Sequence, residues 1–260
     1  MQSWNVGCRL VNQAPQVAEA PKVETKLPDR APVAQDSKEE PPPQAPSIEV
    51  SRSDWAGFYA GVIFGAQFGS SSDKTGDLGY NADDQEWNYG ESGFNGGAEF
   101  GYGYPWHGLV VGPEIELGFL ATGGNGAQPD SPGSDTVGKS SSDFYTAFRA
   151  RVGVDLDSYL IFAAGGAIGV DNEKQVVDSC SIAPCGGSTV DASKKDLQWG
   201  YTIGGGVEHT FAKNWSVKLE YLYFNLGSQS FTGSTNLGVQ YDWTSQTSGH
   251  IIRGGLNYHF

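Results

Sequence analysis

Residues 215–226, Trp-Ser-Val-Lys-Leu-Glu-Tyr-Leu-Tyr-Phe-Asn-Leu, begin with apolar and polar side chains in strict alternation. Trp215 and Leu219 fall on one face of this stretch, whereas Lys218 and Glu220 fall on the other. Successive side chains of a β-strand point to opposite faces, so the stretch predicts a strand with one apolar and one charged face.

The same period-two texture recurs along the chain beyond Asp54. About ten residues are enough for a tilted strand to cross a bilayer, and each segment reaches that length. The predicted strands are Gly57–Gly69, Ser92–Tyr104, Gly108–Leu120, Asp143–Asp155, Ser158–Asn172, Asp196–Thr210, Trp215–Leu226 and Ser248–Phe260.

The connections between these segments alternate in length. Three are short, at 105–107, 156–157 and 211–214. Four are long and polar, at 70–91, 121–142, 173–195 and 227–247. Both chain ends then lie on the side of the short turns, as in even-stranded outer-membrane barrels with periplasmic turns. The sequence predicts an all-β fold, an eight-stranded antiparallel up-and-down transmembrane β-barrel over residues 54–260.

The alternation alone does not say which face of the barrel meets lipid, because a water-soluble barrel turns its apolar face inward. Two features decide the orientation. Glycine gathers on the charged face, as at Gly61 and Gly204, which suits a narrow lumen crowded with side chains. Aromatic residues such as Trp199 and Tyr258 gather near segment ends on the apolar face, as in the interfacial girdles of membrane barrels. We therefore expect the apolar face to look toward lipid.

The predicted lumen then holds five acidic and four basic side chains. Charges removed from water are costly unless they are paired and hydrogen-bonded, so this near balance predicts a network of ion pairs that plugs the barrel. Eight strands leave an interior just wide enough for side chains, which argues against a wide pore. The predicted network comprises Glu99, Glu114, Glu116, Arg149, Arg151, Glu208, Lys218, Glu220 and Arg253.

The overall charge and hydropathy exclude two classes of protein. The formal net charge is −14 and the chain has no basic stripe, which excludes nucleic acid as a partner because phosphate binding needs a basic face. The longest nearly uncharged apolar run, Tyr159–Val170, covers 12 residues, whereas a spanning helix needs about 20. A helical membrane protein is therefore excluded.

Residues 1–53 differ in composition from the rest of the chain. They are rich in Pro, Glu, Lys, Gln and Ala, with three consecutive prolines at 41–43. Such a segment buries too little apolar surface to offset its ordering entropy, so we predict a disordered tail in the periplasm. Residues 1–10 carry no signal-peptide features, which indicates a missing signal or a displaced start, and Cys8 is interpreted as an incidental thiol.

The two other cysteines, Cys180 and Cys185, bracket a hexapeptide in a Gly/Ser-rich segment. In an exported protein such a pair predicts a small disulfide loop. A metal site is the alternative, and it lacks the second pair of ligands that it would need.

Several motifs resemble those of the small outer-membrane β-barrel family, which includes opacity-type surface antigens, the OmpA-like membrane domain and the 25-to-31-kilodalton outer-membrane proteins of alphaproteobacteria. The resemblance covers about residues 55–260. The motifs are Trp55-Ala-Gly-Phe-Tyr-Ala-Gly61, Gly112-Pro-Glu-Ile-Glu-Leu117, Arg149-Ala-Arg-Val-Gly153, Trp199-Gly-Tyr-Thr-Ile-Gly-Gly-Gly-Val-Glu208, Asn214-Trp-Ser-Val-Lys-Leu-Glu-Tyr221 and Arg253-Gly-Gly-Leu-Asn-Tyr-His-Phe260.

The resemblance implies a location in the outer membrane of a Gram-negative bacterium, in contact with its lipid and lipopolysaccharide. It also implies that Tyr258 and the terminal Phe260 form the signal read by the barrel-insertion machinery. In some relatives it further implies host interaction, haem binding or a porin label.

These observations leave four functional hypotheses. We expect a structural, surface-exposed barrel that supports the envelope; the alternatives are a narrow porin-like channel and binding of haem or a host molecule by the loops. Haem binding would need an axial ligand such as His or Tyr on the loops, and Tyr80, Tyr89 and Tyr241 are available. A divalent cation could bind an acidic loop, for which a merely solvated surface is the competing interpretation. The acidic residues of that loop are Asp73, Asp77, Asp83, Asp84, Glu86 and Glu91.

An enzyme with its active site at the outer rim would need a His close to an Asp or a Ser at that rim. His107, His209 and His259 fall near the periplasmic rim instead, and His250 alone falls near the outer one. We therefore expect no enzymatic activity, no cofactor and no metal.

Overall fold

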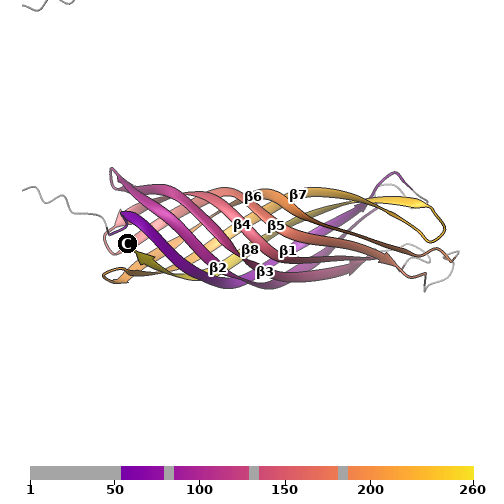
Figure 1. The fold of residues 1–260 in the computed structure, drawn as a ribbon, viewed down its shortest axis with the longest axis horizontal. Helices are drawn as coiled ribbons and strands as arrows, with labels where there is room; N and C mark the ends of the chain where they lie inside the picture. The colour runs from indigo at the N-terminus through magenta and orange to yellow at the C-terminus, as the bar shows by residue number, and fades with distance from the viewer. Residues whose placement is uncertain (1–53, 79–84, 129–134, 181–186) are drawn as a thin grey trace, which may run out of the picture. The chain divides into compact units, whose positions relative to one another are not determined.

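The computed structural model describes residues 54–78, 85–128, 135–180 and 187–260, and they form a closed barrel (Figure 1). Each strand is antiparallel to the next, and β1 pairs with β8 to complete the ring. The predicted eight-stranded antiparallel barrel is confirmed, while the predicted tail and Cys8 lie outside the described residues. The strands are β1 Gly57–Thr75, β2 Glu86–Trp106, β3 Leu109–Ala127, β4 Val137–Leu156, β5 Tyr159–Asp178, β6 Val190–Ala212, β7 Trp215–Ser234 and β8 Gln240–His259.

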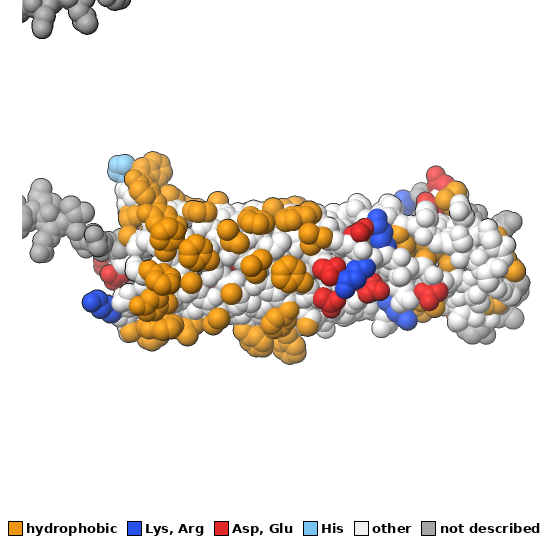
Figure 2. Space-filling model, in the orientation of Figure 1, with side chains coloured by type: hydrophobic (Ala, Val, Ile, Leu, Met, Phe, Trp, Pro, Cys, Tyr) orange, Lys and Arg blue, Asp and Glu red, His pale blue; other side chains and the backbone are white. Residues whose placement is uncertain are grey.

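Apolar side chains cover the outside of the barrel, and charged ones occupy its interior. Phe64 and Leu219 are 63% and 58% exposed, whereas Glu116 and Arg253 are each 1% exposed. Figure 2 shows the apolar side chains gathered over the half that carries the C-terminus, with charged side chains beyond them. The expected orientation, apolar toward lipid and charged toward the axis, agrees with this burial.

None of the described residues forms a helix with the length and hydropathy that crossing a bilayer requires.

Tight turns join β2 to β3, β4 to β5 and β6 to β7 at the end of the barrel that carries the C-terminus (Figure 1). Two of these turns need positive φ, with His107 at 52° followed by Gly108 at 81°, and Asp157 at 60°. The Asp157 N–H donates to the Asp155 carboxylate at 3.1 Å, a local bond that helps an aspartate adopt this conformation. We call this end of the barrel the turn end.

The strands extend much further at the opposite end than the sequence predicts. β1 continues to Thr75 instead of ending at Gly69, and the predicted loop 227–247 shrinks to residues 235–239. The predicted loop boundaries were wrong because these extensions are rich in Ser, Thr, Gly and Asn on both faces, so hydropathy does not alternate there. Pairing of the two strands that flank each long loop, as between Gly126 of β3 and Gly138 of β4, sustains them instead. We call the strand residues within the four predicted loops the stem.

Two of the eight ladders stop where the stem begins. The β6/β7 ladder ends at Tyr201 and Asn225, and the β2/β3 ladder ends at Ser92 and Gly123. The other six ladders continue into the stem. The barrel therefore divides, in the stem, into two four-stranded sheets, β7-β8-β1-β2 and β3-β4-β5-β6.

Substituting Leu219 with arginine tests the orientation of the strands. Leu219 lies midway along the apolar band of β7, and a cation there should lower the unfolding free energy by about 2–4 kcal/mol. Reversible urea unfolding in lipid vesicles measures the loss. Ser141→Arg is the matched control because Ser141 is exposed on the stem, and its variant should unfold like the wild type. Equal losses in the two variants would contradict the assignment of the band to lipid.

Candidate functional site

The lumen brings the nine charged residues of the predicted network together. They come from six strands, and each is at most 7% exposed. Near its centre, Arg253 lies between two carboxylates, with Nη2 2.5 Å from Glu116 Oε1 and 2.6 Å from Glu220 Oε2. Arg149 contacts Glu116 as well, and its Nη1 lies 2.8 Å from Glu220 Oε1. The two guanidinium groups therefore share two carboxylates that come from different sheets of the stem.

A second group of contacts lies nearer the turn end. Arg151 binds Glu208, and Glu208 also accepts a hydrogen bond from Asn257 Nδ2 at 2.8 Å. The Tyr59 hydroxyl donates to Glu114 at 2.6 Å. The guanidinium of Arg151 lies 3.8 Å from the centre of the Phe162 ring, a cation–π contact. Extra donors such as these are what offset the cost of burying carboxylates.

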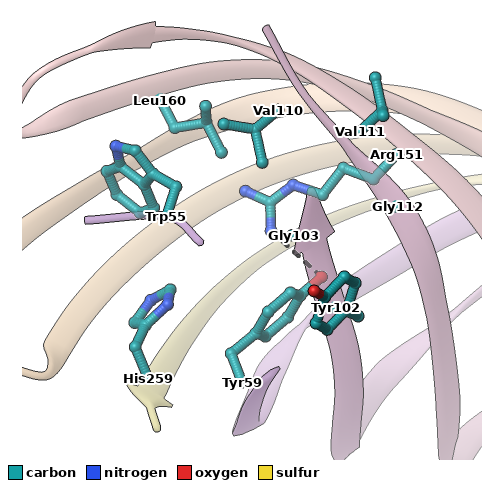
Figure 3. A pocket seen from close by; sticks show the side chains of 10 residues that line it. All are labelled: Trp55, Tyr59, Tyr102, Gly103, Val110, Val111, Gly112, Arg151, Leu160 and His259. Atoms are coloured by element: carbon teal, nitrogen blue, oxygen red, sulfur yellow. Dashed lines mark hydrogen bonds between the residues drawn. The ribbon is translucent and has the colours of Figure 1, made fainter. Parts of the chain in front are cut away.

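Trp55 caps the lumen at the turn end, together with His259. Its indole N–H donates to the Asp157 carbonyl at 3.0 Å, and its ring packs edge-on against His259 at 5.5 Å. Figure 3 shows these side chains around a cavity lined also by Tyr59 and Arg151. The cavity offers about 10 Å³, which is room for one water molecule. No substrate-sized ligand fits there.

Three carboxylates of the lumen, Glu99, Glu114 and Glu116, have oxygens within 4.8 Å of one another. Such a group could hold a cation. The space between them is already shared with protein cations, because Lys218 contacts Glu99 and lies 3.8 Å from Glu114, while Arg149 contacts Glu114 and Glu116. We therefore assign this group to the ion-pair network rather than to a metal site.

One arrangement in the lumen resembles a hydrolytic triad. Ser216 Oγ lies 2.9 Å from His259 Nε2, and the same nitrogen lies 3.6 Å from Glu208. The roles do not match, because Ser216 donates to Glu208 and the carboxylate faces the nitrogen that should accept the serine proton. Ser216 is also 0% exposed. A general base for a serine nucleophile is not assembled here.

An apolar layer fills the lumen beyond the ion pairs, on the side of the stem. All of its members are at most 3% exposed. This layer was not predicted from the sequence. It comprises Leu120, Tyr145, Ala147, Ile168, Val170, Leu222, Phe224, Leu226 and Ile251.

The interior of the stem contains a further polar group and a second apolar layer. Lys174 Nζ donates to Ser71 and Ser140, each at 2.6 Å, and lies 3.3 Å from Glu91. Trp87 and Trp243 belong to the apolar layer that packs between the two stem sheets. The remaining members of that layer are Tyr89, Val176, Val190, Ala192 and Phe231.

These positions correct in part the interpretation of the first long loop as a solvated acidic surface, in which Asp77 and Glu86 are exposed as predicted. Asp73 and Glu91 lie in strands, and both side chains are buried. Beyond the apolar band, burial raises the pKa of Asp73 and lowers the pKa of Lys174. Tyr89 is buried as well, which withdraws one of the three proposed haem ligands from the surface. Tyr80, Asp83 and Asp84 lie outside the described residues.

The predicted residues Cys180, His250, Tyr258 and Phe260 lie outside the ion-pair network. Cys180 is disulfide-bonded, and its predicted partner Cys185 lies outside the described residues. His250 is on the outer surface, where its Nδ1 lies 2.7 Å from the Tyr221 hydroxyl. Tyr258 and Phe260 point outward at the turn end and contact each other edge-on at 5.2 Å.

Comparison with known proteins places this barrel in a family. The family model described as outer membrane protein beta-barrel domain matches residues 42–260. The chain belongs to the outer membrane protein beta-barrel domain family. This membership establishes an outer-membrane protein and agrees with the resemblance that its sequence motifs indicate.

Two curated relatives of this outer-membrane barrel are similar over most of its length. The 31 kDa outer-membrane immunogenic protein of Brucella melitensis is 27% identical over 226 residues, covering 84% of this chain and 89% of the relative. The 22 kDa outer membrane protein of Rhizobium leguminosarum is 29% identical over 178 residues, covering 68% and 67%.

Solved structures of other outer-membrane proteins are also similar. OprG from Pseudomonas aeruginosa has a TM-score of 0.49 at 13% identity, covering 80% of this chain and 99% of that one. The outer membrane protease OmpT from Escherichia coli has a TM-score of 0.47 at 10% identity, covering 82% and 99%.

Replacing Arg253 with methionine tests how far this outer-membrane barrel depends on its central ion pairs. The substitution leaves Glu116 and Glu220 without their shared cation in a buried site, which should lower the unfolding free energy by about 3–5 kcal/mol. Urea unfolding in vesicles measures the loss.

Lys195→Met is the matched control for that substitution. Lys195 is nearly half exposed and pairs with Asp143 at 2.9 Å and Asp171 at 3.3 Å, so its loss should cost about 1 kcal/mol or less. An Arg253→Met barrel as stable as the Lys195→Met barrel would contradict the role assigned to the network.

Proposed function

We propose that this protein is a closed structural barrel that supports the outer membrane and displays its stem and loops at the cell surface. In this proposal the turn end and the N-terminal tail face the periplasm. The observation that carries it is the filled lumen, in which a cap at Trp55, a layer of ion pairs and an apolar layer follow one another along the axis.

The apolar layer argues most strongly against a channel. A permeating ion would have to leave water among the side chains of Leu120, Phe224 and Ile251, each at most 1% exposed. An ion without compensating ligands in such surroundings costs several kcal/mol or more. The ion-pair layer adds a second barrier, because its cations and carboxylates are already engaged with each other.

Surface display is supported by the stem and by the relatives. The strands continue beyond the apolar band as two packed sheets, so the four connections between them are carried away from the membrane surface. A relative named for its immunogenicity fits a protein whose loops are exposed outside the cell. No described group of side chains forms a catalytic constellation, so we propose a non-enzymatic role.

Lipopolysaccharide is the lipid that we propose around the stem side of the band. Lys195 pairs there with Asp143 and Asp171, two residues beyond the outward-facing Leu197 of the apolar band. Ammonium groups can pair with lipid phosphates, and carboxylates can share the divalent cations between them. At the turn end, the outward Tyr258 and Phe260 remain our proposal for the contact with the barrel-insertion machinery.

Single-channel recording in planar bilayers tests the closed lumen. The purified full chain, shown to be folded by heat-modifiable migration in gels, should give no stable conductance steps above those of protein-free bilayers. The apolar layer is the reason, because it removes the water that an ion would follow.

The same recording includes Glu116→Gln and Arg149→Met as variants of the ion-pair layer. Stable ohmic steps in the wild type whose size changes in either variant would establish conduction through the lumen and overturn the proposal. Steps unchanged by both substitutions would also overturn it, by placing a pore elsewhere.

A further inference from the structure

The seam between β6 and β7 is the longest break in the barrel. Residues 190–200 of β6 pair with β5 alone, and residues 228–234 of β7 pair with β8 alone. Each strand therefore presents one unpaired backbone edge to the other over most of the stem. A strand edge is a row of N–H and C=O groups that readily pairs with another extended chain.

The exposure of inward-facing residues shows that this seam is open. Lys194 and Asp196 lie opposite Lys174 and Asn172 on β5, which are 1% and 0% exposed, so all four belong to the same inward face. The side chains of Lys194 and Asp196 are nevertheless 39% and 54% exposed. They are exposed because no adjoining strand of β7 covers them.

Side chains bridge most of the seam, and a backbone hydrogen bond joins its far end. Gln198 Nε2 donates to the Leu226 carbonyl at 3.0 Å, and Lys194 Nζ lies 3.4 Å from the Ser230 carbonyl. At the far end the Asn236 N–H donates to the Thr189 carbonyl at 3.0 Å. A groove of about 420 Å³ runs along the bridged part. Its lining residues are Ser193, Lys194, Ser230, Phe231, Thr232 and Asp242.

The break between β2 and β3 does not leave a strand edge that is open in the same way. Glycines bring the two backbones together there, since a Cβ on Gly124 would lie 2.4 Å from the Gly90 carbonyl oxygen and one on Gly126 would lie 2.6 Å from Tyr89 Cβ. This second seam is closed by direct packing. The β6/β7 seam is packed directly only towards its far end, where a Cβ on Gly233 would lie 2.3 Å from Ala192 Cβ, and from Lys194 to Gln198 it is bridged by exchangeable side-chain contacts.

We propose that the β6/β7 seam binds an extended peptide segment of another protein, which adds to the stem as a strand. A peptide backbone matches the alternating donors and acceptors of a strand edge, and it would replace the few side-chain bridges with a backbone ladder. The proposal does not depend on whether the lumen conducts, so its failure and that of the closed barrel are distinguished by separate experiments.

Charge around the seam defines the partner further. Asp191, Asp196 and Asp242 flank it against Lys194, and the whole chain carries a net charge of −14. Complementarity favours a peptide that carries basic side chains. The exposed face of β7 along the groove is made of Ser230 and Thr232, which suits β-branched neighbours across strands.

The test uses the purified full chain in lipid nanodiscs and a fluorescent ten-residue peptide of alternating valine and threonine with two lysines. We expect saturable binding by anisotropy, together with slower amide exchange in residues 190–200 and 228–234 and unchanged exchange in residues 203–210. The control peptide has the same charge but proline in place of each valine, which removes backbone donors, and should not bind.

Two disulfide variants separate strand addition from nonspecific attraction. Oxidised Ser193→Cys/Thr232→Cys, at positions that the neighbouring Ala192–Gly233 contact places opposite each other, ties the seam shut and should abolish binding, which reduction restores. Oxidised Ser230→Cys/Thr244→Cys links residues already paired in the β7/β8 ladder and should bind like the wild type. Lys194→Ala/Gln198→Ala removes both bridges and should bind roughly thirtyfold more tightly, because the peptide no longer has to displace two hydrogen bonds.

Four outcomes would overturn the proposal. They are equal binding of the proline peptide, binding that survives the closed seam, protection confined to other strands, and seam amides that already exchange as slowly as residues 203–210 in the free protein. Self-association that protects the seam without peptide would likewise reject a foreign strand as its occupant.

Discussion

Backbone hydrogen bonding in hydrocarbon is the constraint on which the rest of this structure depends. A strand that crosses a bilayer must place its N–H and C=O groups in ladders, because lipid offers no partner for them. Closure of β1 onto β8, from Tyr59 and His259 to Thr75 and Trp243, removes the edges that an open sheet would leave. The constraint relaxes where water is available, and the β6/β7 ladder ends at Tyr201, beside the outward-facing Trp199 that marks the edge of the apolar band.

Closure also determines what the lumen can contain. A ring of eight strands admits side chains but little water, so each charge inside needs a partner inside. Arg253 joins Glu116 of β3 to Glu220 of β7, and contacts of this kind tie opposite walls of the barrel together. The apolar layer above them makes the lumen a packed core, and in this respect the barrel resembles the interior of a soluble protein more than a pore.

The sequence predicted the membrane part of every strand and its orientation, because lipid outside and charge inside impose alternation on pairs such as Lys218 and Leu219. It did not predict the stem, since residues 70–75, Ser-Ser-Ser-Asp-Lys-Thr, carry no such alternation and become a strand through pairing with β2 and β8. Such non-local pairing depends on register, which hydropathy alone does not encode.

The alternation of side chains along each strand identified the residues that line the lumen. It did not identify which of them pair with each other. Glu116 and Arg253 are 137 residues apart, and strand tilt decides which side chains meet at one height along the axis. The apolar layer is nevertheless indicated by the sequence. Residues Tyr221-Leu-Tyr-Phe224 are apolar on both faces of the strand, and this pattern indicates that the lumen is apolar where they lie. The seam left none, since an unpaired edge is a property of two strands and not of either one.

A nitroxide scan of residues 215–226 in bilayers tests whether closure of the barrel separates a lipid face from a packed interior. Collision rates with dissolved oxygen should peak at odd positions such as 217, 219 and 221, while the even positions should be shielded from both oxygen and a water-soluble nickel reagent. Even positions in contact with lipid, or the loss of the two-residue period, would contradict this separation.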